Sequence, residues 1–135
     1  MDRAELLQTL GDYFRTRPEV LAAWLFGSQA RATARADSDV DVAILLQGGA
    51  PRSVPEYGLL TDIQADLEAV LRRDVDVVVC NGAAPDLLHR VLRDGVLVHE
   101  SDHERRILFE VAARNEYWDL LPILDLYRRK LLEGA

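Results

Sequence analysis

A glycine-serine pair and two aspartates are the residues of this sequence whose types and spacing could do chemistry. Gly27-Ser28 ends an apolar run at 20–26, and Asp39 and Asp41 open a second run at 40–46, with ten residues between Ser28 and Asp39. Side chains two apart on a strand share a face, so Asp39 and Asp41 are expected to present adjacent carboxylates, whereas Val40, Val42 and Ile44 face a core. Such charges repel unless a cation separates them, and carboxylates beside a phosphate are ligands that Mg²⁺ uses. The pattern therefore predicts a metal site at the start of the second strand.

The Gly27-Ser28 pair suits a phosphate group. Glycine lets the backbone approach an anion closely and adopt a positive φ, and Ser28 adds a hydroxyl and can cap a short helix whose amino end favours an anion. We therefore expect Gly27 and Ser28 to bind a nucleotide phosphate. Arg31 is the nearest arginine of the same loop. It is either a further phosphate ligand or a solvated loop residue.

A third carboxylate interrupts another apolar run. Asp76 lies within the valine-rich segment 75–80, where an unpaired carboxylate would be costly to bury, so we expect a compensating partner for it. Asp74 has the same strand parity but lies nearer the start of the segment, and we expect it to solvate the turn. Asp76 is therefore the stronger candidate for a functional carboxylate.

The run GSQARATARADSDVD resembles the signature of the DNA polymerase beta nucleotidyltransferase superfamily, which is Gly-Ser, ten residues, Asp-x-Asp. Within that superfamily the short chain is similar to the minimal nucleotidyltransferase (MNT) type, from Leu21 to about Tyr127. The resemblance implies a nucleotidyltransferase fold with ATP as substrate and two Mg²⁺ ions. It also implies that Asp39, Asp41 and Asp76 are the catalytic metal ligands.

The resemblance further implies a partner, because proteins of the MNT type are typically antitoxins paired with HEPN-domain toxins. The expected reaction is transfer of AMP from ATP to a hydroxyl, most simply a tyrosine, of a HEPN ribonuclease toxin. Two alternatives stay open: a nucleotidyltransferase acting on a small hydroxylated molecule, and a non-catalytic antitoxin that acts by binding alone. A full set of three carboxylates argues against the second, since binding alone does not require a costly acidic cluster.

Composition limits the possible classes. The chain has 135 residues, of which 49% are apolar, enough for one folded domain over 1–135 but not two. Its net charge of −7 counts against direct nucleic-acid binding. We see no apolar run long enough to span a membrane and no signal peptide, and the single Cys80 excludes an internal disulfide. These features predict a cytoplasmic protein with Cys80 in the core.

The order of helical and strand patterns predicts an α/β (α+β) fold: a small mixed sheet with helices packed mainly on one face and the metal site at a sheet edge. The C-terminal segment, about 101–132, is expected to be a helical tail that Pro122 breaks or kinks. Tyr117 and Trp118 on this tail are either core residues or anchors for a protein partner. We predict strands at 20–26, 40–46, 75–80 and 96–98, and helices at 4–17, 55–71, 85–94 and from 101 onward.

Overall fold

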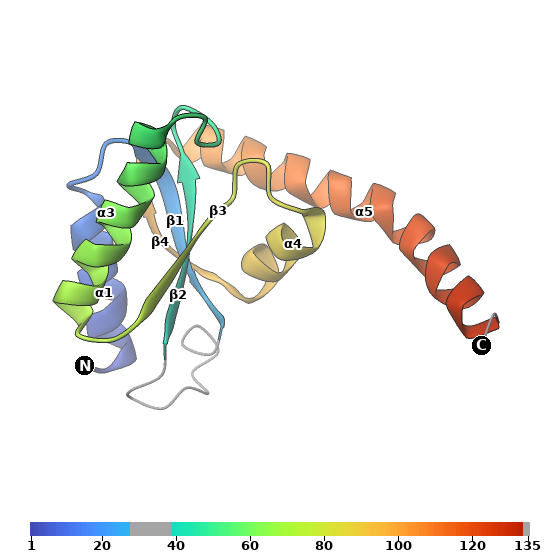
Figure 1. The fold of residues 1–135 in the computed structure, drawn as a ribbon, viewed down its shortest axis with the longest axis horizontal. Helices are drawn as coiled ribbons and strands as arrows, with labels where there is room; N and C mark the ends of the chain where they lie inside the picture. Colours follow the sequence, from blue (N-terminus) through green and yellow to red (C-terminus); the bar gives the residue numbers. More distant parts are fainter. Residues whose placement is uncertain (28–38, 134–135) are drawn as a thin grey trace.

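The computed structural model describes residues 1–27 and 39–133, so Ser28 and Arg31 of the predicted phosphate loop lie outside the described residues. The described chain forms a four-stranded sheet in the order β3-β2-β1-β4 (Figure 1). β1 is antiparallel to both β2 and β4, whereas β2 and β3 are parallel, so the sheet is mixed as predicted. The strands are β1 (Val20–Phe26), β2 (Val40–Leu46), β3 (Val75–Val79) and β4 (Val96–Glu100).

One face of the sheet is covered by α1 (Arg3–Phe14) and α3 (Val54–Leu71). Helix α1 begins where the Asp2 side chain accepts a hydrogen bond from the Glu5 backbone, which satisfies a free donor at the helix start. Its residues Leu6, Leu10 and Phe14 recur every four positions and are buried, and the buried residues of α3, Ile63, Leu67 and Leu71, have the same spacing. This α1/α3 face comprises, among others, Leu6, Leu10, Phe14, Leu25, Val42, Ile44, Ile63 and Leu67.

The opposite face is covered by α4 (Pro85–Asp94) and the first part of α5 (His103–Glu133). The predicted fold class is confirmed, but the helices lie on both faces rather than mainly on one. The reason is that, apart from Asp41, both alternating sets of β1 and β2 residues are apolar and require cover from water. This α4/α5 face comprises, among others, Leu21, Trp24, Ala43, Leu45, Cys80, Leu88, Val91 and Ala113. Burial raises the pKa of the Cys80 thiol to about 12, which confirms Cys80 as an unreactive core residue.

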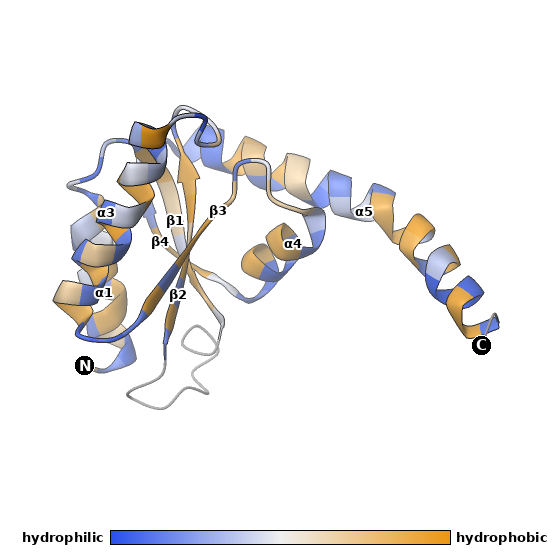
Figure 2. Cartoon of the chain, viewed as in Figure 1, coloured by the Kyte–Doolittle hydropathy of each residue, from blue (hydrophilic) through white to orange (hydrophobic). Residues whose placement is uncertain are grey.

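Helix α5 is continuous through Pro122, so the predicted break near this residue is wrong. Proline removes the hydrogen bond to the carbonyl four residues earlier, but Pro122 is exposed and water can satisfy that carbonyl. The second half of α5 extends away from the sheet (Figure 1), and apolar residues recur along it (Figure 2). None of the described helices is long and apolar enough to cross a lipid bilayer.

Candidate functional site

The pairing of β2 with β3 places two of the predicted carboxylates side by side. Asp41 and Asp76 are partners in the parallel register, so their Cα atoms lie directly across from each other. Val40 and Val42 flank Asp41 and are fully buried in the α1/α3 face. Because neighbours on a strand alternate, Asp41 and its partner lie on the α4/α5 face. The described part of β2 therefore places a carboxylate at the end of the sheet where β2 begins, on the face that α4 covers.

Burial and repulsion act together on Asp41. Its pKa is raised above the ordinary value, first by burial and then by the negative charges of Asp76 and Asp39. Asp74 is not among the causes of this shift. Neighbouring carboxylates repel each other in their charged forms, and a cation between them relieves this repulsion. The chemistry of this donor set therefore fits Mg²⁺, which prefers oxygen ligands.

The carboxylates do not form a closed cage. Among the residues that the structure describes, no three His, Cys, Asp or Glu side chains lie close enough to hold one ion together. Asp76 is exposed on the edge strand, so the expectation that it is buried at a cost is wrong. An open pair of carboxylates suits an ion that is shared with a substrate phosphate, as Mg²⁺ commonly is.

Both the backbone conformation at Gly27 and the space around it require a glycine. Its φ is +73°, a conformation that residues with a side chain rarely adopt. A Cβ atom at this position would also collide with the Asp41 carboxylate. A side chain here would therefore strain the turn after β1 and displace Asp41, so the glycine keeps the approach to the carboxylate open.

The residues around Asp41 enclose a pocket of about 280 Å³, here called the Asp41 pocket. Sequence analysis missed its wall on α4, which supplies Arg90, Arg93 and Asp94. The available signal was the three-residue spacing of the arginines, which places both on one side of a helix that directly follows the Asp76 strand. The pocket is lined by Phe26, Gly27, Asp41, Arg90, Arg93 and Asp94.

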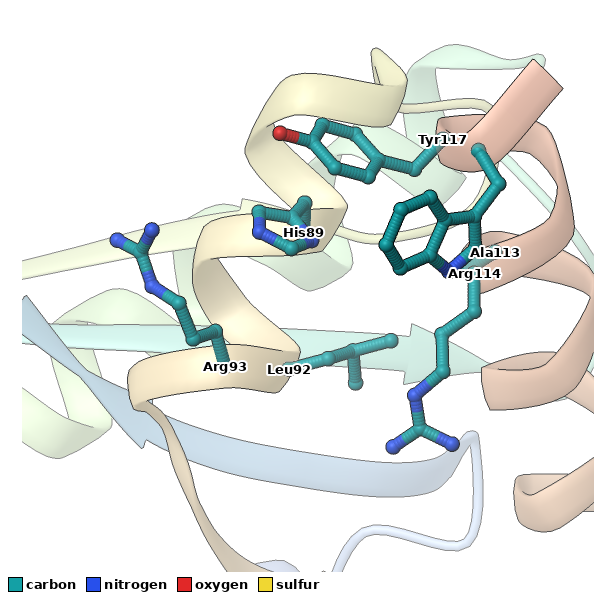
Figure 3. A pocket seen from close by; sticks show the side chains of 7 residues that line it. His89, Leu92, Arg93, Ala113, Arg114 and Tyr117 are labelled. Atoms are coloured by element: carbon teal, nitrogen blue, oxygen red, sulfur yellow. The ribbon is translucent and has the colours of Figure 1, made fainter. Parts of the chain in front are cut away.

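Tyr117 and Trp118, the predicted partner-binding pair, differ in their surroundings. The Tyr117 ring stacks on the His89 ring, with centroids 3.7 Å apart and planes within 6°, so it fastens α5 to α4. Figure 3 shows this stack, with Arg93 and Arg114 extending away from it. The two helices line a cavity of about 270 Å³ there. Trp118 is 65% exposed, so it is the member of the pair that is free to contact another protein.

Known proteins resemble this chain in sequence or in structure. A protein of Methanocaldococcus jannaschii named "putative protein adenylyltransferase" is 36% identical over 77 residues, which is 57% of this chain and 77% of that protein. A toxin-antitoxin crystal structure with AMP-PNP matches with a TM-score of 0.74 at 20% identity, over 98% of this chain and 99% of the other. An MNT antitoxin in complex with a tri-AMPylated HEPN toxin of Shewanella oneidensis matches with a TM-score of 0.72 at 19% identity, over 96% and 98%.

The family model described as "Polymerase beta, Nucleotidyltransferase" matches residues 8–104. This range contains Gly27, the carboxylates of β2 and β3, and the whole of α4. It covers well over half of the chain, and the fold agrees with that of the matched structures. The chain therefore belongs to the polymerase beta nucleotidyltransferase family.

Proposed function

We propose that this protein transfers AMP from ATP to a hydroxyl group, that of a tyrosine, on a HEPN ribonuclease toxin and thereby neutralises it. The observation that carries the proposal is the pairing of Asp41 with Asp76 beside Gly27 in a nucleotidyltransferase fold. The matched relatives support the choice of reaction, since one is named a protein adenylyltransferase and another is an antitoxin bound to an AMPylated toxin.

Each carboxylate has a role in this proposal. Asp39, Asp41 and Asp76 would hold two Mg²⁺ ions, which supply charge neutralisation for the triphosphate and for the attacking oxygen. Gly27 leaves room for the phosphates next to Asp41, and Ser28 and Arg31 are proposed to bind them. The acceptor oxygen bonds to the α-phosphorus as the bond to the β-phosphate oxygen breaks. Pyrophosphate leaves, and the exposed Asp76 accepts the hydroxyl proton.

The outer part of α5 is the proposed contact surface for the toxin. Large apolar side chains are mostly exposed there, whereas a monomeric protein would be expected to bury or scatter them. Trp118 lies closest to the body of the protein and has the amphipathic ring that often anchors interfaces. The proposal places the protein in the cytoplasm, where ATP is available. The exposed apolar residues of this surface are Trp118, Ile123, Leu126, Tyr127, Leu131 and Leu132.

Substoichiometric inhibition tests the proposal. The protein is mixed with a tenfold excess of its HEPN toxin and magnesium-ATP, and the toxin is then separated and examined for mass and ribonuclease activity. We expect the toxin to gain the mass of one or more adenylyl groups and to stay inactive after separation. Asp41→Asn should fold and bind the toxin but add no mass.

The alternatives give different results. A protein that acts by binding alone would inhibit fully only when it is present in at least the same amount as the toxin. The mass of the toxin would stay unchanged, and the toxin would be active again after separation. Asp41→Asn would then inhibit as well as the native chain. A nucleotidyltransferase for small molecules would leave the toxin both active and unmodified.

A further inference from the structure

Arg90 stands out among the charged residues of the Asp41 pocket because nothing on the described chain neutralises it. It lies on α4, is exposed and lines the pocket. Among the described residues, none forms a hydrogen bond or ion pair with it. Arg93, one turn further on, differs: its Nε and Nη2 atoms donate to the two oxygens of Asp94, at 3.0 and 2.9 Å. The pocket thus holds one arginine fixed by a carboxylate and one that is free to bind a ligand.

The pocket also keeps its opposite charges apart. The shift of the Asp41 pKa has burial, Asp76 and Asp39 as its causes, and Arg90 is not among them. Arg90 therefore does not serve to neutralise Asp41, although both residues line the same pocket. A ligand that fits both walls must offer a positive group to the carboxylates and a negative group to the guanidinium. A phosphate chain that carries a cation has this character, and arginine binds phosphate bidentately.

We propose that Arg90 binds the terminal phosphates of the nucleotide and so positions the leaving pyrophosphate. The inference rests on the proposed function, which requires the reacting α-phosphorus to lie at Asp41 and Asp76. The phosphates beyond it then extend towards another wall of the pocket, and α4 offers Arg90 there. Arg93 lies on the same wall, and its guanidinium group is held in a fixed position by Asp94. Arg90 is thus a binding residue, and it takes no part in moving the acceptor proton.

A structural role for Arg90 makes a different prediction. Arg90 lies within α4, and an arginine can stabilise a helix surface through the packing of its aliphatic stem. If Arg90 served only this purpose, its removal would lower the melting temperature of the free protein and leave ligand binding unchanged. Measurements of stability and of binding on the same variants therefore separate the two roles.

The test is calorimetric titration of the native chain, Arg90→Ala and Arg90→Lys with ATP, AMP and inorganic pyrophosphate, in the presence of Mg²⁺ and at low salt. Arg114→Ala is the matched control, since Arg114 is an exposed arginine of α5 outside the pocket. We expect Arg90→Ala to weaken ATP and pyrophosphate binding by about 10- to 100-fold, the usual effect of losing a charge-assisted hydrogen bond. AMP binding should not change, Arg90→Lys should recover part of the loss, and Arg114→Ala should behave as the native chain.

Other results would overturn the proposal. Native affinity for ATP and pyrophosphate in Arg90→Ala, with a lower melting temperature, would assign Arg90 a purely structural role on α4. Equal losses for AMP and ATP would move it away from the terminal phosphates. If the native chain binds pyrophosphate through Arg90 but never modifies a toxin, the anion site stands and the proposed function fails. A native chain that binds neither ATP nor pyrophosphate overturns both.

Discussion

The two faces of the sheet are built for different purposes. The α1/α3 face is closed: its apolar side chains are buried, and a polar cluster fastens the two helices at the surface. In that cluster Asp66 of α3 accepts a hydrogen bond from the Tyr13 hydroxyl and an ion pair from Arg17, both at 2.7 Å. This face therefore serves mainly to stabilise the fold.

The α4/α5 face is apolar only in part. Trp24 and Leu88 are buried in it, but beyond Phe26 the face opens into the Asp41 pocket, which is lined by charged side chains. A sheet can carry this arrangement because alternate residues of one strand serve different layers. Val42 belongs to the closed core, and Asp41 beside it belongs to the pocket. Changes on the two faces should therefore separate stability from activity.

The largest effect is expected at the carboxylates. Asp41→Asn should lower transfer activity by at least about 100-fold, since charge stabilisation by a bound metal is worth several kcal/mol. The free protein should keep its melting temperature or gain a few degrees, because the change removes repulsion from Asp76 and Asp39. Transfer assays and thermal melting on the same preparation measure both effects.

A matched pair on β3 provides the control for that experiment. Asp76→Asn should lose activity as Asp41→Asn does, because Asp76 is the register partner of Asp41. Asp74→Asn should remain active, since Asp74 lies before β3 and does not affect the pKa of Asp41. Full activity in Asp76→Asn would show that the third carboxylate has been misassigned.

Truncation of one leucine on each face compares the two layers directly. Leu67→Ala in the α1/α3 face should cost about 3 kcal/mol of the free energy of unfolding, because it leaves a cavity in a fully buried core. The protein that remains folded should show the native increase in melting temperature with magnesium-ATP. Leu88→Ala on α4 should lower stability and reduce this increase as well, because it loosens the helix that carries Arg90. Equal nucleotide effects in both variants would contradict the division between the faces.

A smaller effect is expected where α5 leaves the α4/α5 face. Trp118→Ala should weaken toxin binding by about 10-fold or more with little change in melting temperature, because the ring is exposed in the free protein. Tyr117→Ala should do the reverse, since its loss removes the stack on His89 that joins α5 to α4. Binding measured by titration, together with thermal melting, distinguishes them. Native affinity in Trp118→Ala would exclude this ring as an anchor.

Part of the difference between the two faces can be predicted from the sequence. The apolar runs around Gly27 and Asp41 gave the bounds of β1 and β2, because a buried strand requires continuous hydrophobic residues. Local patterns do not reveal which helix covers which face, since that depends on how elements distant in sequence pack. Arg90 and Arg93 were missed for this reason, as they join the site only when α4 folds back against β1, next to Asp41. Pro122 was misjudged because local propensity gives no information about exposure.

The smallest predicted effect concerns pH and the cluster that fastens the α1/α3 face. The hydrogen bonds from Tyr13 and Arg17 hold the pKa of the Asp66 carboxyl below its ordinary value. A carboxyl with a lowered pKa stabilises the fold above its unfolded value of about 3.9, and this contribution is lost as the pH falls through the lower folded value. Burial, followed by the hydrogen bond to Asp66, raises the pKa of Tyr13 to about 12, so the contribution of Tyr13 is complete below about pH 10 and is lost as the pH approaches 12. The melting temperature of the native chain should therefore fall more between pH 7 and pH 3 than that of Asp66→Asn. The difference between these two falls should be smaller than the decrease in melting temperature caused by Leu67→Ala.

Asp62→Asn is the control, because Asp62 is an exposed aspartate of the same helix. This variant should follow the native pH dependence. If the two variants respond alike, acid stability arises from the overall charge of −7 and not from this cluster.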